Sequence, residues 1–290
     1  MKDLLTSTLM YRLSRHQWQS RKMKRGLHKG GRRSNKQGTS LEFSDYRYYQ
    51  PGDDLRQIDW NVFARTNKHY IKRFLDEQEL IMTIYLDCSN SMKIIPEKWN
   101  TSRGLAASIG YMSLSSDDRV GVFPVGAKDH PFLYKKGRAF SNRLVHYLDE
   151  VTCDETQVPF SDAVQRVIQS KSGVTIVISD LLEPLEKIEE TLKRLQAHKE
   201  ELYVIQVLSL EEMDPFYHGD LQLVDSETSE FMNVTMSATV KKQYKQRLSY
   251  QTDQIHKFCN QRGIGFVVCQ ANHSLEDIIF KTLTSKGLVQ

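Results

Sequence analysis

The 290-residue chain has no hydrophobic run long enough to cross a membrane. A spanning helix needs about 20 consecutive apolar residues, and no stretch of this chain approaches that length. Residues 1–5 also lack the long apolar segment of a secretory signal. We therefore expect a soluble, cytoplasmic protein.

Cysteine is scarce, and the glycine-rich motifs of nucleotide-binding loops are missing. The four cysteines lie far apart and form no CxxC pair, which disfavours a zinc cluster and fits free thiols. Neither GxGxxG nor GxxxxGK[ST] occurs, so a phosphate-cradling loop has no support.

Acidic residues are nearly missing from the first part of the chain. Residues 1–36 contain eleven Lys or Arg and one acid, so this segment carries +10 while the net charge of the whole chain is only +4. Such an arm could bind nucleic acid, an anionic lipid surface or an acidic protein, and the alternative is a solvated helix end that runs into a flexible loop. No aromatic residues interleave its most basic part, residues 21–36, so nucleic acid is the less favoured partner.

Hydrophobic periodicity predicts a helix at the N-terminus and an α/β domain further on. Leu4, Leu5, Leu9, Leu13 and Trp18 indicate an amphipathic helix over roughly the first 25 residues. From Ile81, apolar runs alternate with amphipathic stretches. The predicted strands cover residues 81–87, 119–125, 131–134, 174–179, 202–208 and 264–268. The pattern predicts a doubly wound, mostly parallel sheet with helices on both faces, plus a small β-hairpin insertion between residues 214 and 234.

The first predicted strand of this domain ends in Asp87-Cys88-Ser89-Asn90-Ser91. Ligands of open α/β sheets bind outside the carboxyl ends of the strands. One carboxylate and two hydroxyls there form an all-oxygen donor set, which suits Mg²⁺, Mn²⁺ or Ca²⁺ better than zinc. The alternative is that these side chains only satisfy backbone donors at a strand-to-helix turn.

A second aspartate, Asp180, follows the predicted strand 174–179. A doubly wound sheet brings such strand ends to one edge, so we expect Asp180 near Asp87. Asp87 could instead act in Mg²⁺-dependent phosphoryl transfer, although Ser89 stands where aspartyl-phosphate hydrolases usually carry a second acid. We identify no positioned general base and expect a protein that is not an enzyme.

Residues 40–60 combine aromatic rings with alternating Arg and Asp and show little helix or strand period. Arginines can form bidentate hydrogen bonds to aspartates, so we expect a structural network that pins an irregular or β segment. The residues assigned to this signature are Asp45, Arg47, Pro51, Gly52, Asp53, Arg56, Asp59 and Trp60.

Asp87, Ser89, Ser91 and Asp180 resemble the metal-ion-dependent adhesion site of von Willebrand factor type A domains. The resemblance implies a divalent ion with an open position for a partner's carboxylate. The family's threonine ligand falls near Val158, whose side chain cannot ligate, and Thr156 or Ser161 could take its place.

The signature segment, continued by Ala64-Arg65 and Glu77, resembles the bacterial "domain of unknown function 58" family. That family joins this signature to a von Willebrand-like domain, and many relatives carry two N-terminal transmembrane helices that this chain lacks. The resemblance implies a soluble member that works as an adaptor with a MoxR-type AAA+ ATPase.

The predicted organisation has three parts. Residues 1–36 form a basic helix and flexible loop, 37–78 carry the signature and pack on the main domain, and 79–290 form the von Willebrand-like domain. The predicted function is a protein-binding adaptor with a divalent-cation site. Phosphoryl transfer by Asp87 and anionic-surface binding by the basic arm remain alternatives.

Overall fold

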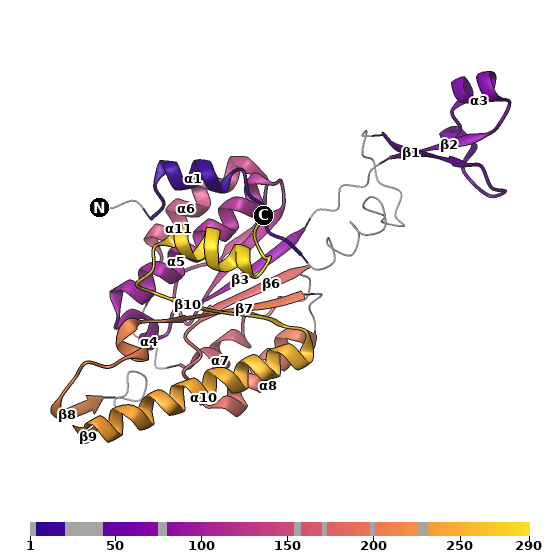
Figure 1. Cartoon of the computed structure of the whole chain (residues 1–290). Helices are drawn as coiled ribbons and strands as arrows, with labels where there is room; N and C mark the ends of the chain where they lie inside the picture. The colour runs from indigo at the N-terminus through magenta and orange to yellow at the C-terminus, as the bar shows by residue number, and fades with distance from the viewer. Residues whose placement is uncertain are drawn as a thin grey trace. The chain divides into compact units, whose positions relative to one another are not determined.

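Figure 1 shows the chain as a computed structural model, which describes residues 4–20, 43–74, 80–153, 158–169, 173–197, 201–224 and 231–290. The chain divides into two compact units. The main unit contains residues 1–19 and 80–290, and the small unit contains residues 20–79. The most basic part of the arm, residues 21–36, lies outside the described residues.

A six-stranded sheet in the order β10-β7-β6-β3-β4-β5 forms the centre of the main unit. Its strands are β3 (Ile81–Asp87), β4 (Arg119–Val125), β5 (Phe132–Lys136), β6 (Val174–Ser179), β7 (Glu201–Leu208) and β10 (Gly265–Gln270). Every neighbouring pair is parallel except β4 and β5. The predicted α/β fold with a mostly parallel sheet is confirmed.

Helices cover both faces of the sheet (Figure 1). One face packs against α1 (Ser7–Leu13), α5 (Pro96–Ser115) and α6 (Ser141–Glu150). The C-terminal segment, which consists of α11 (Leu275–Asp277) and the π-helix Ile278–Leu283, covers the same face. The other packs against α7 (Phe160–Val164), α8 (Leu185–Ala197) and α10 (Ala238–Arg262). Because both faces are covered, β3 contributes Ile84 and Leu86 to one core and Tyr85 to the other.

The order of the strands creates a topological switch point beside β3. From β3 the chain adds β4 on one side, and it later returns to add β6 on the other. The carboxyl ends of β3 and β6 are therefore neighbours, and the loops that follow them diverge there. Such a point is where open α/β sheets bind ligands.

The N-terminal helix is shorter than predicted. Helix α1 ends at Leu13, and Trp18 lies in an extended segment that forms an isolated antiparallel bridge with Val289. The Trp18 indole is buried and meets the Tyr203 ring edge-on at 5.3 Å. Trp18 continues the apolar spacing of the helix in the sequence because it is buried, although it lies beyond the last helical residue, Leu13.

The predicted hairpin insertion is present as β8 (Gly219–Val224) and β9 (Phe231–Met236). Two short helices follow other strand ends, α4 (Asn90–Lys93) after β3 and α9 (Leu210–Met213) after β7. Among the described residues, no helix combines the length and apolar character that crossing a bilayer requires.

The small unit pairs β1 (Phe43–Tyr48) with β2 (Tyr70–Phe74) and also contains the 3-10 turn η1 (Leu55–Gln57) and α3 (Trp60–Thr66). The sequence shows little helix or strand period over residues 40–60, where we expected an irregular or β segment, and β1 lies within that segment. Asp45 lies within β1, and Gly52 adopts a positive φ of 102° in the Pro51-Gly52 turn. Trp60 opens α3 with its ring largely exposed.

Ion pairs connect the signature residues within this unit. Asp59 is buried, caps α3 through the amides of Asn61 and Val62, and accepts a hydrogen bond from the Tyr46 hydroxyl at 2.8 Å. That hydrogen bond, with help from Lys72, lowers the pKa of Asp59 to about 2. Two arginine–aspartate ion pairs also lie in this unit: Arg47 with Asp53 at 2.7 Å and Arg56 with Asp54 at 3.0 Å.

Candidate ion-binding cleft

Asp87 is the last residue of β3, and its side chain is only 1% exposed. One carboxylate oxygen, Oδ1, accepts a hydrogen bond from the Ser89 amide at 2.9 Å. The other, Oδ2, accepts one from the Ser179 hydroxyl at 2.6 Å, so the end of β6 supports the carboxylate at the end of β3. Sequence reasoning did not assign this supporting role to Ser179.

The two serines of the loop present their hydroxyls next to one another. Ser89 occupies the N-cap position of α4, yet its side chain makes no capping hydrogen bond. Its Oγ lies 3.0 Å from Ser91 Oγ instead. N-cap serines ordinarily bond the amide two or three residues on, whereas the Ser89 side chain bonds Ser91 and Asp87.

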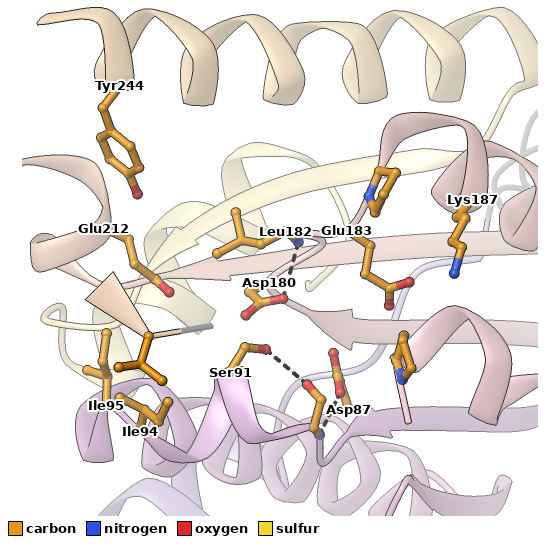
Figure 2. A pocket seen from close by; sticks show the side chains of 14 residues that line it. Asp87, Ser91, Ile94, Ile95, Asp180, Leu182, Glu183, Lys187, Glu212 and Tyr244 are labelled. Atoms are coloured by element: carbon orange, nitrogen blue, oxygen red, sulfur yellow. Dashed lines mark hydrogen bonds between the residues drawn. The ribbon is translucent and has the colours of Figure 1, made fainter. Parts of the chain in front are cut away.

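These residues line a cleft of about 550 Å³ at the switch point, shown in Figure 2. Asp87 and Asp180 both face the cleft, and Glu183, Lys187 and Glu212 add charged groups to its walls. Its apolar lining residues are Ile94, Ile95, Pro159, Leu182, Pro184, Val224 and Tyr244. The structure therefore brings together four of the predicted site residues: Asp87, Ser89, Ser91 and Asp180.

Burial raises the pKa of Asp87 to about 7, and the negative charge of Asp180 adds to the effect. The hydrogen bonds from Ser179 and Ser89 act in the opposite direction, because they favour the ionised form. A carboxylate in this setting gains from a nearby cation, which would offset both the burial and the repulsion.

Asp180 follows β6, and both of its carboxylate oxygens already have partners. Oδ1 accepts a hydrogen bond from the Leu182 amide at 3.3 Å, and Oδ2 lies 2.8 Å from the ammonium of Lys98. The next residue, Leu181, has a φ of +53°, and Gln251 of α10 donates to its carbonyl at 3.0 Å. Hydrogen bonds from a neighbouring element thus hold the unusual turn that places Asp180.

Lys98 is the residue of this site that sequence reasoning missed. It projects from the first turn of α5, is fully buried, and bridges Asp180 and Glu212, the latter at 2.5 Å. Burial opposes a charged lysine, but the two carboxylates outweigh that effect and raise the pKa of Lys98. Lys98 therefore remains an ammonium and joins the loops after β6 and β7 to α5.

The loop expected to supply a threonine is described only in part. Thr156 lies outside the described residues, and Val158 packs against the hydrophobic core beneath α7 and α8. Ser161, the other substitute, is engaged elsewhere: its amide donates to Glu183 Oε1 at 2.9 Å and its hydroxyl to Oε2.

The donor set at Asp87 fits a hard cation through its chemistry. In the described parts of the chain, no three His, Cys, Asp or Glu side chains converge to hold a metal ion, so an ion in the cleft would depend on serine hydroxyls. The side chains of Asp87, Ser89 and Ser91 provide only oxygen, and the Ser89 hydroxyl makes no helix cap that an ion would have to break.

The fold and the cleft define a class: an α/β protein with an oxygen-rich cleft at the switch point of its sheet. Residues 45–258 match the family described as "Protein of unknown function DUF58". The match covers most of the chain, and the chain belongs to this family. Membership in the family, expected from the signature segment, is confirmed.

The relatives found by sequence are mycobacterial. The chain is 26% identical over 200 residues to the uncharacterised protein Rv1480 of Mycobacterium tuberculosis (strain ATCC 25618 / H37Rv) and, at the same identity, to the uncharacterised protein Mb1516 of Mycobacterium bovis. These alignments cover 66% of this chain and 62% of each relative, so the chain spans less than two thirds of their length.

Among solved structures, the chain is similar to the conserved hypothetical protein BatB from Bacteroides thetaiotaomicron. The identity is 13%, the TM-score is 0.38, and the alignment covers 72% of this chain and 98% of BatB.

Proposed function

We propose that this protein is a binding module of the von Willebrand factor A type, which recruits a protein partner through a divalent cation held at Asp87. The observation that carries the proposal is the pair of hydroxyls, Ser89 and Ser91, which lie 3.0 Å apart beside the buried Asp87 carboxylate. Mg²⁺ is the ion that we favour, with Mn²⁺ and Ca²⁺ as alternatives, since all three prefer oxygen ligands.

In this proposal the ion supplies positive charge at the floor of the cleft. Asp87 and the two serine hydroxyls would hold it, and Ser179 would keep the carboxylate oriented through its 2.6 Å hydrogen bond. One carboxylate neutralises only part of the charge of a divalent cation, so the ion would still attract another anionic oxygen, such as a carboxylate of the partner.

The rim of the cleft supports a protein partner. Ile94 and Val224 are 64% and 61% exposed, and Leu182 and Tyr244 are also exposed. Apolar side chains around a polar centre are typical of protein-binding surfaces, in which apolar contacts provide affinity and the polar centre provides specificity. We further propose, from family resemblance, that the partner is a MoxR-type AAA+ ATPase and that the two proteins bind in the cytoplasm.

The alternative functions have less support. Phosphoryl transfer at Asp87 would benefit from a general base, and no histidine is among the described residues that line the cleft. Binding to nucleic acid or anionic lipid through the basic arm stays a prediction, because residues 21–36 lie outside the described residues.

Isothermal titration at pH 8 with Mn²⁺, and then with Mg²⁺, tests the proposed ion. We expect one site in the wild-type protein and a loss of about 100-fold or more in affinity for Asp87→Asn, which keeps the shape of the side chain but removes its charge. Asp162→Asn is the matched control: Asp162 is half exposed, pairs with Lys187, and does not line the cleft. Equal affinities of wild type and Asp87→Asn would refute the proposed site.

A further inference from the structure

Lys98 is a buried cation placed where it can compete with a metal ion for one of the predicted ligands. Its side chain is fully buried, and its ammonium lies 2.8 Å from Asp180 Oδ2 and 2.5 Å from Glu212 Oε1. Buried charged groups are costly unless they are paired, and this lysine is paired twice. One carboxylate oxygen of Asp180, Oδ2, is thus already bound to a cation that belongs to the chain, and the other, Oδ1, accepts a hydrogen bond from the Leu182 amide.

The other contacts of the three residues fix this arrangement. Glu212 Oε2 accepts hydrogen bonds from the amide and hydroxyl of Ser209, and Ser209 in turn caps α9. The Leu182 amide holds Asp180 Oδ1. Lys98 is anchored by α5, a helix that is buried over most of its length. Asp180 and Glu212 therefore cannot turn away from Lys98 without losing the hydrogen bonds to Leu182 and Ser209.

The charges of the cleft follow from this arrangement. Lys98 neutralises one of the two carboxylates that it contacts. Among the described carboxylates that line the cleft, Asp87 is the one that forms hydrogen bonds with Ser89. An ion bound there would meet a single carboxylate from this chain. More of its positive charge would then remain for an anionic partner, because two carboxylates would neutralise a divalent ion.

We infer that Lys98 is a positioning residue that withholds Asp180 from the ion, so that the site binds a divalent cation weakly and depends on a carboxylate of the partner to complete it. This inference rests on the proposed ion site. It assigns Asp87, Ser89 and Ser91 as the ligands from this chain and places Asp180 outside the ligand set.

Three variants test the inference by isothermal titration with Mn²⁺ at pH 8. Lys98→Met removes the ammonium and keeps most of the aliphatic volume, and it is expected to bind Mn²⁺ on the order of tenfold more tightly than wild type because Asp180 is released. Lys187→Met is the control, since Lys187 lines the same cleft but is half exposed and pairs with Asp162. Its expected change is within about threefold, because solvent screens an exposed charge.

The double variant Lys98→Met/Glu212→Gln separates release of Asp180 from a change in net charge. It carries the same net charge as wild type, and glutamine can replace glutamate in the capping box with Ser209. In the double variant only Asp180 loses its positive partner, because Glu212 has become a neutral glutamine. The double variant therefore tests the inference if the single variant Lys98→Met does not fold. Tighter Mn²⁺ binding than wild type is expected here as well.

The third variant, Asp180→Asn, keeps Lys98 paired with Glu212 and retains an acceptor for the Leu182 amide. We expect Mn²⁺ affinity within about threefold of wild type, in contrast to the large loss for Asp87→Asn. A loss for Asp180→Asn as large as for Asp87→Asn, or unchanged affinity in folded Lys98→Met and in the double variant, would overturn the inference and leave the ion site standing. No Mn²⁺ binding by any of these proteins would overturn the proposed function together with it.

Discussion

At the scale of single residues, the proposed ion site depends on the protonation of Asp87. Its pKa of about 7 arises first from burial and second from the charge of Asp180. A raised pKa means that the folded state holds this proton more tightly than the unfolded chain does. Without an ion, this group therefore favours folding most below its ordinary pKa of 3.8, and its contribution is lost as the pH rises through about 7.

In the proposed site the same proton would compete with a metal ion, since a carboxylate ligand must be ionised. We expect the affinity for Mn²⁺ to rise about tenfold per pH unit below pH 7 and to level off above about pH 8, with release of one proton on binding at pH 6. Titrations in buffers of different ionisation enthalpy measure this release. An affinity that is constant between pH 6 and pH 8 would show that Asp87 is not a ligand or is not protonated in this range.

Lys98 shows what sequence reasoning could not reach at this scale. A lysine in the first turn of a helix, in Pro96-Glu97-Lys98, is usually exposed, and nothing in its spacing predicts burial. Its role depends on Asp180 and Glu212, which lie 82 and 114 residues further along the chain. Asp87 and Asp180, in contrast, could be predicted because each lies at the carboxyl end of a mostly apolar, buried strand.

At the scale of elements, the strands were the most predictable part of the fold. β3, β4 and β6 have the residue ranges expected from the sequence, because a strand buried on both faces is an uninterrupted apolar run between polar turns. The N-terminal helix was predicted too long because Trp18 is buried by a bridge to Val289 rather than by a helix. For β1 the sequence predicted only an irregular or β segment, since its alternating aromatic and charged residues carry no clear apolar face.

Close packing between α5 and α6 depends on Gly110. A Cβ built at this position would lie 2.4 Å from Leu144 Cδ2, and Leu144 is fully buried. We expect Gly110→Ala to lower the free energy of unfolding by about 1–3 kcal/mol through overpacking, despite the better helix propensity of alanine. Chemical denaturation followed by circular dichroism measures the change.

The double variant Gly110→Ala/Leu144→Ala provides the control for this contact. If the clash is the cause, adding Gly110→Ala to a Leu144→Ala background should cost little or should stabilise, because the new methyl group enters the space that Leu144 left. Equal costs of Gly110→Ala in both backgrounds would assign the effect to something other than the contact with Leu144.

At the scale of the whole molecule, the strand order accounts for the position of the cleft. Asp87, Asp180 and Glu212 follow three neighbouring strands, β3, β6 and β7, and α5 brings Lys98 to the same edge. The doubly wound arrangement, predicted from the alternation of strands and helices, is what gathers these loops. The identity of a partner depends on the surface of that partner, so it could not be derived from this chain.

A crystal of the protein grown with Mn²⁺ and measured at the manganese absorption edge tests the central claim most directly. We predict one anomalous peak in the cleft, at bonding distance from the Asp87 carboxylate and the hydroxyls of Ser89 and Ser91. Asp180 should keep its ion pair with Lys98. The absence of any anomalous peak in the cleft at saturating Mn²⁺, with Asp87 and both serines well ordered, would contradict the account.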